Sequence, residues 1–115
     1  MTTIESLTEK ILIFRDERDW LQFHSPKNMA AAIAIEAAEL QELFLWKSEQ
    51  EQVQITEARR ERIGEELADI AVYLFELTHN LGYDLGRLIQ DKLEKNAKKY
   101  PVSLSKGTSK KYTEL

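Results

Sequence analysis

The chain has 115 residues, a length typical of one domain, and its 43% hydrophobic and 31% charged residues exclude an intrinsically disordered protein. The absence of cysteine excludes a disulfide framework, a thiolate nucleophile and a cysteine-bound metal. A formal net charge of −4 argues against a nucleic-acid partner, and no apolar stretch approaches the roughly 20 residues that span a bilayer. Residues 1–9 lack the pattern of a signal peptide, so we expect a cytoplasmic protein with no membrane partner.

The hydrophobic periodicity predicts an all-α protein, and nothing in the sequence indicates a strand of useful length. A first helix is expected over about residues 3–20. A second follows Ser25, whose hydroxyl can cap it, with Pro26 at the first helical position, and it continues to about Lys47. Residues 48–55 are expected to form a polar connection, after which Thr56 can cap a third helix.

The second half of the chain carries equally clear helix boundaries. The third helix is expected to end near Leu81, because Gly82 can supply the left-handed stop. Asp84 can cap a fourth helix, which Pro101 closes. We therefore expect a four-helix domain over residues 1–101, followed by an extended, basic tail over residues 102–115.

Two pairs of acidic residues lie where core residues are expected. Glu36 falls within the apolar stripe of the second helix, and Glu39 lies one turn further along. Glu66 and Asp69 repeat this spacing along one flank of the third helix. Like charges at this spacing repel and lose hydration when buried, so a cation should compensate them, and oxygen ligands suit Mg²⁺, with Mn²⁺ as the alternative.

A solvated helix surface is the simpler interpretation of these acids, and the residues alone leave it open. Acidic pairs at this spacing are frequent on solvated helices, and the chain has others, such as Glu61 with Glu65. A di-iron bundle also uses inward carboxylates, but it needs two Glu-x-x-His motifs. The sequence offers only Glu76 with His79, so the di-iron interpretation fails on the number of ligands.

Two further groups of side chains are candidates for binding an anionic, aromatic ligand. The fourth helix changes from apolar to cationic along one face, and its candidates for a phosphate chain are Lys92, Asn96 and Lys99, although lysines near a helix end are often simply solvated. Aromatic residues flank the second and third helices. They include Trp20, His24, Trp46 and Tyr73. Of these, Trp20 with His24 is the candidate for stacking on a nucleobase and reading its edge, although tryptophan in a small domain is usually a core residue.

At these residues the sequence resembles a known family, the MazG-like all-α nucleoside triphosphate pyrophosphohydrolases, and within it the dCTP pyrophosphatase branch. The acidic pairs match the family pattern ExxE followed by ExxD. Four flanking segments resemble the branch in the same order: RDWLQFHSPKN, ELFLWK, EELADIAVYL and KNAKKYP. The resemblance covers about residues 14–101. Some relatives have a histidine in the base pocket where this chain has Ile11, which leaves base selectivity open.

The resemblance implies a site and an assembly. It makes Glu36, Glu39, Glu66 and Asp69 the Mg²⁺ ligands. Which carboxylate orients the attacking water is not given by the sequence, and Glu36 and Glu39 are our candidates. The resemblance places the four aromatic candidates around the nucleotide and the three fourth-helix candidates near phosphate or sugar. It also implies a four-helix, MazG-like fold that assembles as a dimer or a dimer of dimers.

The function expected from the resemblance is Mg²⁺-dependent hydrolysis of a nucleoside triphosphate, dCTP or a modified dCTP, to monophosphate and pyrophosphate. Divalent ions would let a triphosphate share a pocket with four carboxylates. A dUTPase-like activity, a phosphoribosyl-ATP pyrophosphohydrolase-like activity and a non-enzymatic helical adaptor remain as alternatives.

Overall fold

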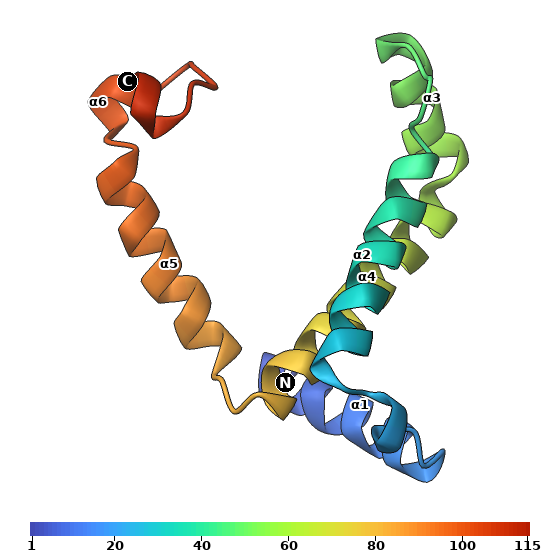
Figure 1. Cartoon of the computed structure of the whole chain (residues 1–115). Helices are drawn as coiled ribbons and strands as arrows, with labels where there is room; N and C mark the ends of the chain where they lie inside the picture. Colours follow the sequence, from blue (N-terminus) through green and yellow to red (C-terminus); the bar gives the residue numbers. More distant parts are fainter. The chain divides into compact units, whose positions relative to one another are not determined.

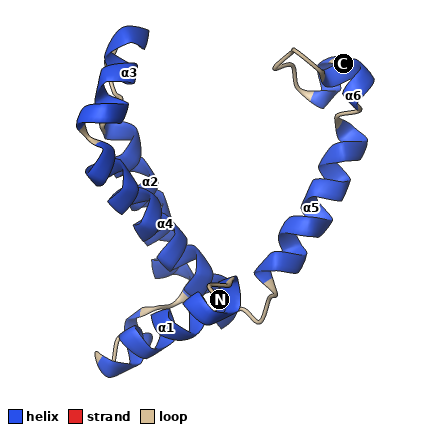
Figure 2. Ribbon diagram, turned by 180° about the vertical axis from the view of Figure 1, so that it is seen from behind, coloured by secondary structure: helices blue, strands red, loops and turns tan.

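All regular structure in the chain is helical, as predicted. The computed structural model describes residues 1–115, and it contains helices and loops but no strand (Figures 1 and 2). None of the helices combines the length and the apolar character that crossing a membrane requires. The α-helices are α1 (Ile4–Glu17), α2 (Pro26–Glu42), α3 (Glu49–Ala58), α4 (Arg60–Asn80), α5 (Leu85–Lys99) and α6 (Val102–Ser105), and short 3₁₀ helices cover Leu21–Phe23 and Tyr112–Glu114.

Six α-helices form where four were predicted, and they divide between two compact units. The first unit, Met1–Gly82, contains α1 to α4, and the second, Tyr83–Leu115, contains α5 and α6. The sequence predicted one bundle of four helices that included residues 85–99. This prediction is wrong, because α5 belongs to the second compact unit. Of the two extra helices, α3 is polar and α6 has only four residues, and hydrophobic periodicity does not reveal such elements.

Capping residues set several boundaries where the sequence predicted them. The Ser25 side chain accepts a hydrogen bond from the backbone N–H of Asn28 and begins α2. The Asp84 side chain accepts one from the backbone N–H of Arg87 and begins α5. Gly82 ends the preceding segment with a φ of 80°, a left-handed conformation that glycine adopts without strain.

Two other predicted boundaries are wrong, for local reasons. The first helix ends at Glu17, and Asp19, with a φ of 54°, takes the chain out of helical geometry before Trp20. The second helix ends at Glu42 and is followed by turns up to Trp46, whose φ is 64°.

The expected polar connection over residues 48–55 is instead the start of α3. Ser48 and Glu51 form a capping box, in which each side chain accepts a hydrogen bond from the other residue's backbone N–H. This pair begins a helix that has little apolar character. Thr56 lies inside α3 and donates its hydroxyl to the Gln52 carbonyl, so it caps nothing.

Within the first unit, α2 and α4 run antiparallel and pack against each other, and α1 packs across α4 (Figure 1). The core is small. Met29, 1% exposed, is the only fully buried apolar side chain, whereas α4 buries the polar residues Glu66, Glu76 and Thr78. Buried carboxylates require compensating partners, which directs attention to the α4 interfaces.

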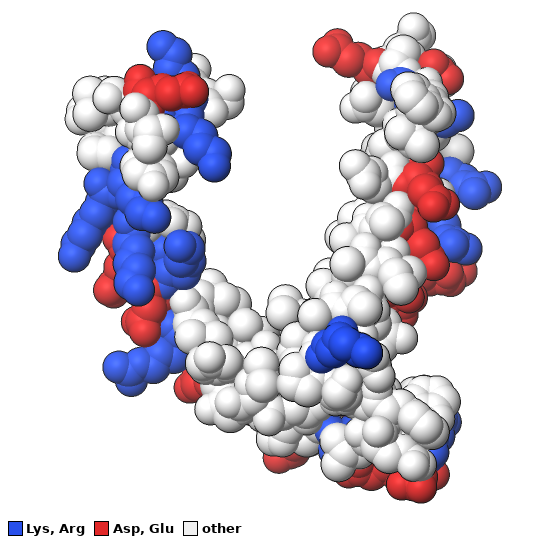
Figure 3. Space-filling model, in the orientation of Figure 1, with Lys and Arg blue, Asp and Glu red and all other residues white.

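The prediction that the tail after Pro101 is extended is wrong, because the tail contains short helices and folds against the end of α5. Residues 102–105 form α6, and the Tyr112 ring makes an edge contact with Tyr100 at 6.0 Å between ring centroids. The Lys99 ammonium lies 4.9 Å from the centroid of the same Tyr112 ring. In Figure 3, lysine and arginine side chains gather over the second half of α5 and the segment that follows it.

Candidate active site

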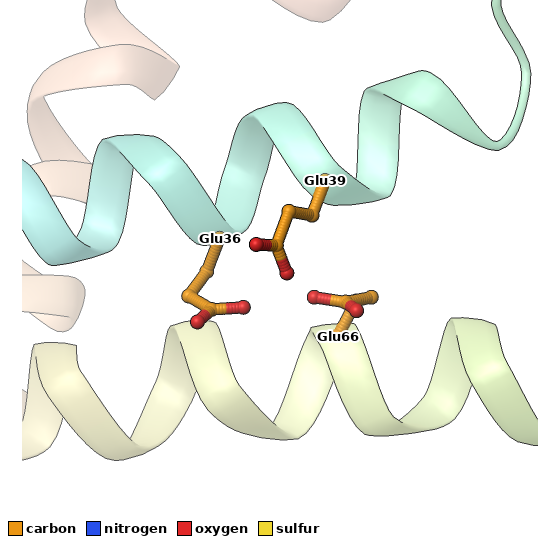
Figure 4. A group of neighbouring side chains, drawn as sticks. All are labelled: Glu36, Glu39 and Glu66. Atoms are coloured by element: carbon orange, nitrogen blue, oxygen red, sulfur yellow. The ribbon is translucent and has the colours of Figure 1, made fainter.

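The α2–α4 interface brings three of the four predicted metal ligands together. Glu36 and Glu39 project from α2 toward Glu66 on α4, so that three carboxylates face one another (Figure 4). One oxygen from each lies within 4.8 Å of the others. The spacing of three residues puts the α2 pair on one helix face, and the antiparallel neighbour supplies the third acid.

The protein supplies this cluster with too little positive charge. The pKa of Glu36 is raised to about 7, first by burial and then by a hydrogen bond with Glu66 and by the negative charges nearby. Arg62 contacts one Glu66 oxygen, with 2.8 Å between Nε and Oε1. The Oε2 atoms of Glu36 and Glu66 are buried without any hydrogen-bond partner. Two unpartnered buried oxygens and a raised pKa are the properties expected of carboxylates that bind a cation.

The fourth predicted ligand, Asp69, lies outside the group of three. It is exposed, one turn of α4 beyond Glu66, yet close enough for its charge to raise the pKa of Glu36. The pKa of Tyr73 is also raised, by burial first, then by the charge of Glu36 and then by that of Asp69. The acidic potential therefore extends along α4 from the cluster toward Tyr73.

A cavity of about 650 Å³ adjoins the acidic face of α4. It is bounded by α1, the segment after α1, and α4, and Trp20, His24, Asp69 and Tyr73 contribute to its lining. Its size is within the range of small-molecule sites. Ile11 and the charged residues Lys10, Arg15 and Glu76 also line the cavity. The other lining residues are apolar: Leu7, Phe14, Ala68, Ala71, Val72 and Phe75.

Aromatic rings line the wall of this cavity near the segment after α1. Trp20 contacts Phe14 edge-on at 5.8 Å between centroids, and His24 lies 6.4 Å from Trp20. The Arg18 guanidinium carbon lies 3.6 Å from the centroid of the Phe14 ring. These contacts give Trp20 a supported position at the cavity wall.

Sequence reasoning missed the residues that hold His24. The buried Glu76 carboxylate, 2% exposed, lies 2.7 Å from His24 Nδ1 through its Oε2 atom, and the buried Arg15 and the exposed Asn80 complete the same hydrogen-bonded network. The signal was present in the spacing of α4. Polar residues recur there every three or four positions on one face: Glu66, Asp69, Tyr73, Glu76 and Asn80.

The remaining predicted binding residues are not part of this cavity. Trp46 is 91% exposed in the turn that follows α2. Lys92, Asn96 and Lys99 belong to α5 in the second unit, and Asn96 is the only one of these three that is partly buried. Their roles stay predictions.

Known proteins resemble this chain over most of its length. A sequence model of the MazG-like family matches residues 31–115. The chain is 41% identical to dCTP pyrophosphatase 1 of Rattus norvegicus, over 98% of this chain and 68% of the relative. It is 39% identical to dCTP pyrophosphatase 1 of Homo sapiens, with the same coverage.

A solved structure agrees with these sequence matches. The crystal structure of a pyrophosphatase from Archaeoglobus fulgidus superposes with a TM-score of 0.83 at 39% identity. The match covers 88% of this chain and 94% of the archaeal chain. The family match over residues 31–115 includes the segments that carry both acidic pairs. The chain therefore belongs to the MazG-like family.

Proposed function

We propose that this chain is a nucleoside triphosphate pyrophosphohydrolase that acts on dCTP or a modified dCTP, releasing the monophosphate and pyrophosphate. The observation that carries the proposal is the cluster of Glu36, Glu39 and Glu66 at the α2–α4 interface, beside a cavity of suitable size for a nucleotide base. The dCTP pyrophosphatases that resemble the chain over 98% of its length support the reaction and the substrate.

Mg²⁺ fits the donor set of the site. Carboxylate oxygens are the ligands that hard cations prefer, and the two buried Oε2 atoms of Glu36 and Glu66 have no other partner. Glu36, Glu39 and Glu66 would hold the ion, with Asp69 as the fourth ligand of the site. When bound, Mg²⁺ supplies charge neutralisation and polarises the phosphate that is attacked.

The other side chains of the site have separate roles in orienting the water, binding the base and binding the phosphates or the sugar. Glu36 or Glu39 orients the attacking water and accepts its proton through a free carboxylate oxygen. Trp20 stacks on the base, and His24 and Tyr73 contact it from the same cavity. Trp46 adds a second aromatic surface, and the cationic face of α5, with Lys92, Asn96 and Lys99, binds the phosphates or the sugar.

The active protein is proposed to be a homodimer or a dimer of dimers. With Met29 as the only fully buried apolar side chain, one copy alone lacks the core that a stable domain of this length requires. Large apolar side chains are instead exposed along the helices, including Ile35, Leu67, Leu81, Leu88, Ile89 and Leu93. Residues 1–101 would form the catalytic domain, and residues 102–115 a basic tail that closes over the triphosphate.

A nucleotide panel with product identification tests this function. Purified protein is incubated with each deoxynucleoside triphosphate and Mg²⁺, and the products are separated by anion exchange. We expect dCMP and pyrophosphate, no turnover in EDTA, and loss of turnover in Glu39→Gln, while Glu65→Gln, an exposed acid outside the cluster, stays active. Release of diphosphate and orthophosphate would reject the mechanism, and no turnover of any nucleotide would favour the helical adaptor. Preferred hydrolysis of dUTP or phosphoribosyl-ATP would favour the alternative activities.

A further inference from the structure

The hydrogen-bonded network of Arg15, Asn80, Glu76 and His24 at the cavity wall has one possible direction of hydrogen bonding. Arg15 is 7% exposed and carries only donors, so its Nη1 atom must donate to Asn80 Oδ1, at 3.0 Å. This bond fixes the orientation of the Asn80 amide. The Asn80 Nδ2 group then faces Glu76 and donates to its Oε2 atom, at 3.0 Å.

The same network fixes the tautomer of His24. Glu76 Oε2 receives the amide of Asn80, lies 3.6 Å from Arg15 Nη1, and lies 2.7 Å from His24 Nδ1. An oxygen surrounded by donors accepts at every contact, so the hydrogen of a neutral His24 ring is on Nδ1. Nε2 is then a bare acceptor, and it is the one ring nitrogen without a partner in the chain.

This acceptor belongs to the wall of the cavity. His24 lines the cavity together with Trp20, and its side chain is 17% exposed. A ligand that places a hydrogen-bond donor against Nε2 gains a bond there. A ligand that places a carbonyl oxygen there sets two acceptors against each other.

We infer that Glu76, held by Arg15 and Asn80, is a positioning residue that sets the His24 tautomer and thereby selects bases with an exocyclic amino group over bases with a carbonyl group at that position. Cytosine and uracil differ in this way at C4, so the network distinguishes dCTP from dUTP. The inference deepens the proposed function and rests on it for the identity of the ligand. It explains how a chain with Ile11 in the cavity wall can still read the base edge.

A paired substitution reverses the direction of the network without changing its charge. In Glu76→Gln combined with Asn80→Asp, the new carboxylate accepts from Arg15, and its second oxygen accepts from the amide of residue 76. The other hydrogen of that amide then points at His24 Nδ1 and moves the imidazole hydrogen to Nε2. The matched control is Glu76→Gln alone, where the amide oxygen takes the place of Oε2 because Asn80 and His24 both donate to it.

Two measurements test the inference independently of hydrolysis. The first is ¹⁵N NMR of the histidine rings at pH 8 in a His79→Gln background, which leaves His24 as the only histidine. We expect the hydrogen on Nδ1 in the wild type and in Glu76→Gln, and on Nε2 in the double variant. The opposite tautomer in the wild type, or no change in the double variant, would overturn the inference.

The second measurement is the affinity for the reaction products dCMP and dUMP, by calorimetry. We expect a preference for dCMP of roughly tenfold in the wild type, the same order in Glu76→Gln, and equality or reversal in the double variant. An unchanged ratio despite a changed tautomer would show that His24 does not read the base. If the double variant does not fold, the inference is tested by the wild-type tautomer and by the dCMP preference of Glu76→Gln. A hydrogen on Nε2 in the wild type, or loss of the preference in Glu76→Gln, would then overturn it. Failure of the hydrolysis assay with a retained dCMP preference would reject the proposed function alone.

Discussion

Replacing Glu36 by glutamine should stabilise the metal-free protein above neutral pH. The folded state holds a proton on Glu36 up to about pH 7, whereas the unfolded chain releases it near 4.5. Because the folded pKa is raised, the stability contributed by the protonated form falls as the pH rises from about 4.5 to 7, and it is lost above that range. Glutamine stays neutral at every pH and avoids this loss.

The size of the effect follows from the shift in pKa. Each unit corresponds to about 1.4 kcal/mol, so a shift from 4.5 to about 7 gives an upper bound of about 3–4 kcal/mol. Glu36 is only half-buried, and solvent screening reduces the expected gain to about 1–2 kcal/mol. For a chain of this length that gain raises Tm by about 4–8 °C.

The assay is thermal unfolding followed by circular dichroism in EDTA, at one protein concentration, at pH 8 and pH 4.5. Glu36→Gln should unfold at a higher temperature than the wild type at pH 8, and most of the difference should vanish at pH 4.5. Glu65→Gln, an exposed acid beside Glu66 in sequence, should show little change at either pH. A lower Tm for Glu36→Gln at pH 8 would refute the claim that this carboxylate is destabilising without a cation.

Three further predictions follow from other contacts. The Mg²⁺ concentration for half-maximal activity should rise as the pH falls below about 7, by up to about tenfold per unit, because protons compete for Glu36; a flat profile between pH 6 and 8 would argue against Glu36 as a ligand. Met29→Ala should lower the free energy of unfolding in urea by about 2–5 kcal/mol, since it empties the one fully buried apolar position. Ile35→Ala, at a position that is exposed in a single copy of the chain, should lower the free energy of unfolding of that copy much less. Deleting residues 106–115 removes the two Tyr112 contacts, worth about 1 kcal/mol each, which limits the loss of stability. Because the tail is proposed to close over the triphosphate, KM should rise more than stability falls, and an unchanged KM would remove the tail from the site.

The sequence by itself determined the elements whose cause is local. Ser25, Asp84 and Gly82 act on the backbone within a few residues, so the ends of α2, α4 and α5 that they set were predictable. The acidic pairs were predictable as well, since a spacing of three residues fixes a shared helix face before any tertiary contact forms. Where local signals were weak, as in the capping box at Ser48 that begins α3, the prediction failed.

Only the tertiary structure decided which distant residues meet. Glu76 is 52 residues from His24 and Asn80 is 65 residues from Arg15, so no local pattern joins them. Packing of α1 and the segment after it against α4 places these groups within hydrogen-bond distance and turns separate polar residues into one network. The same packing brings Glu66 to the α2 pair, because the burial and charge repulsion that raise the pKa of Glu36 exist only when the two helices are in contact.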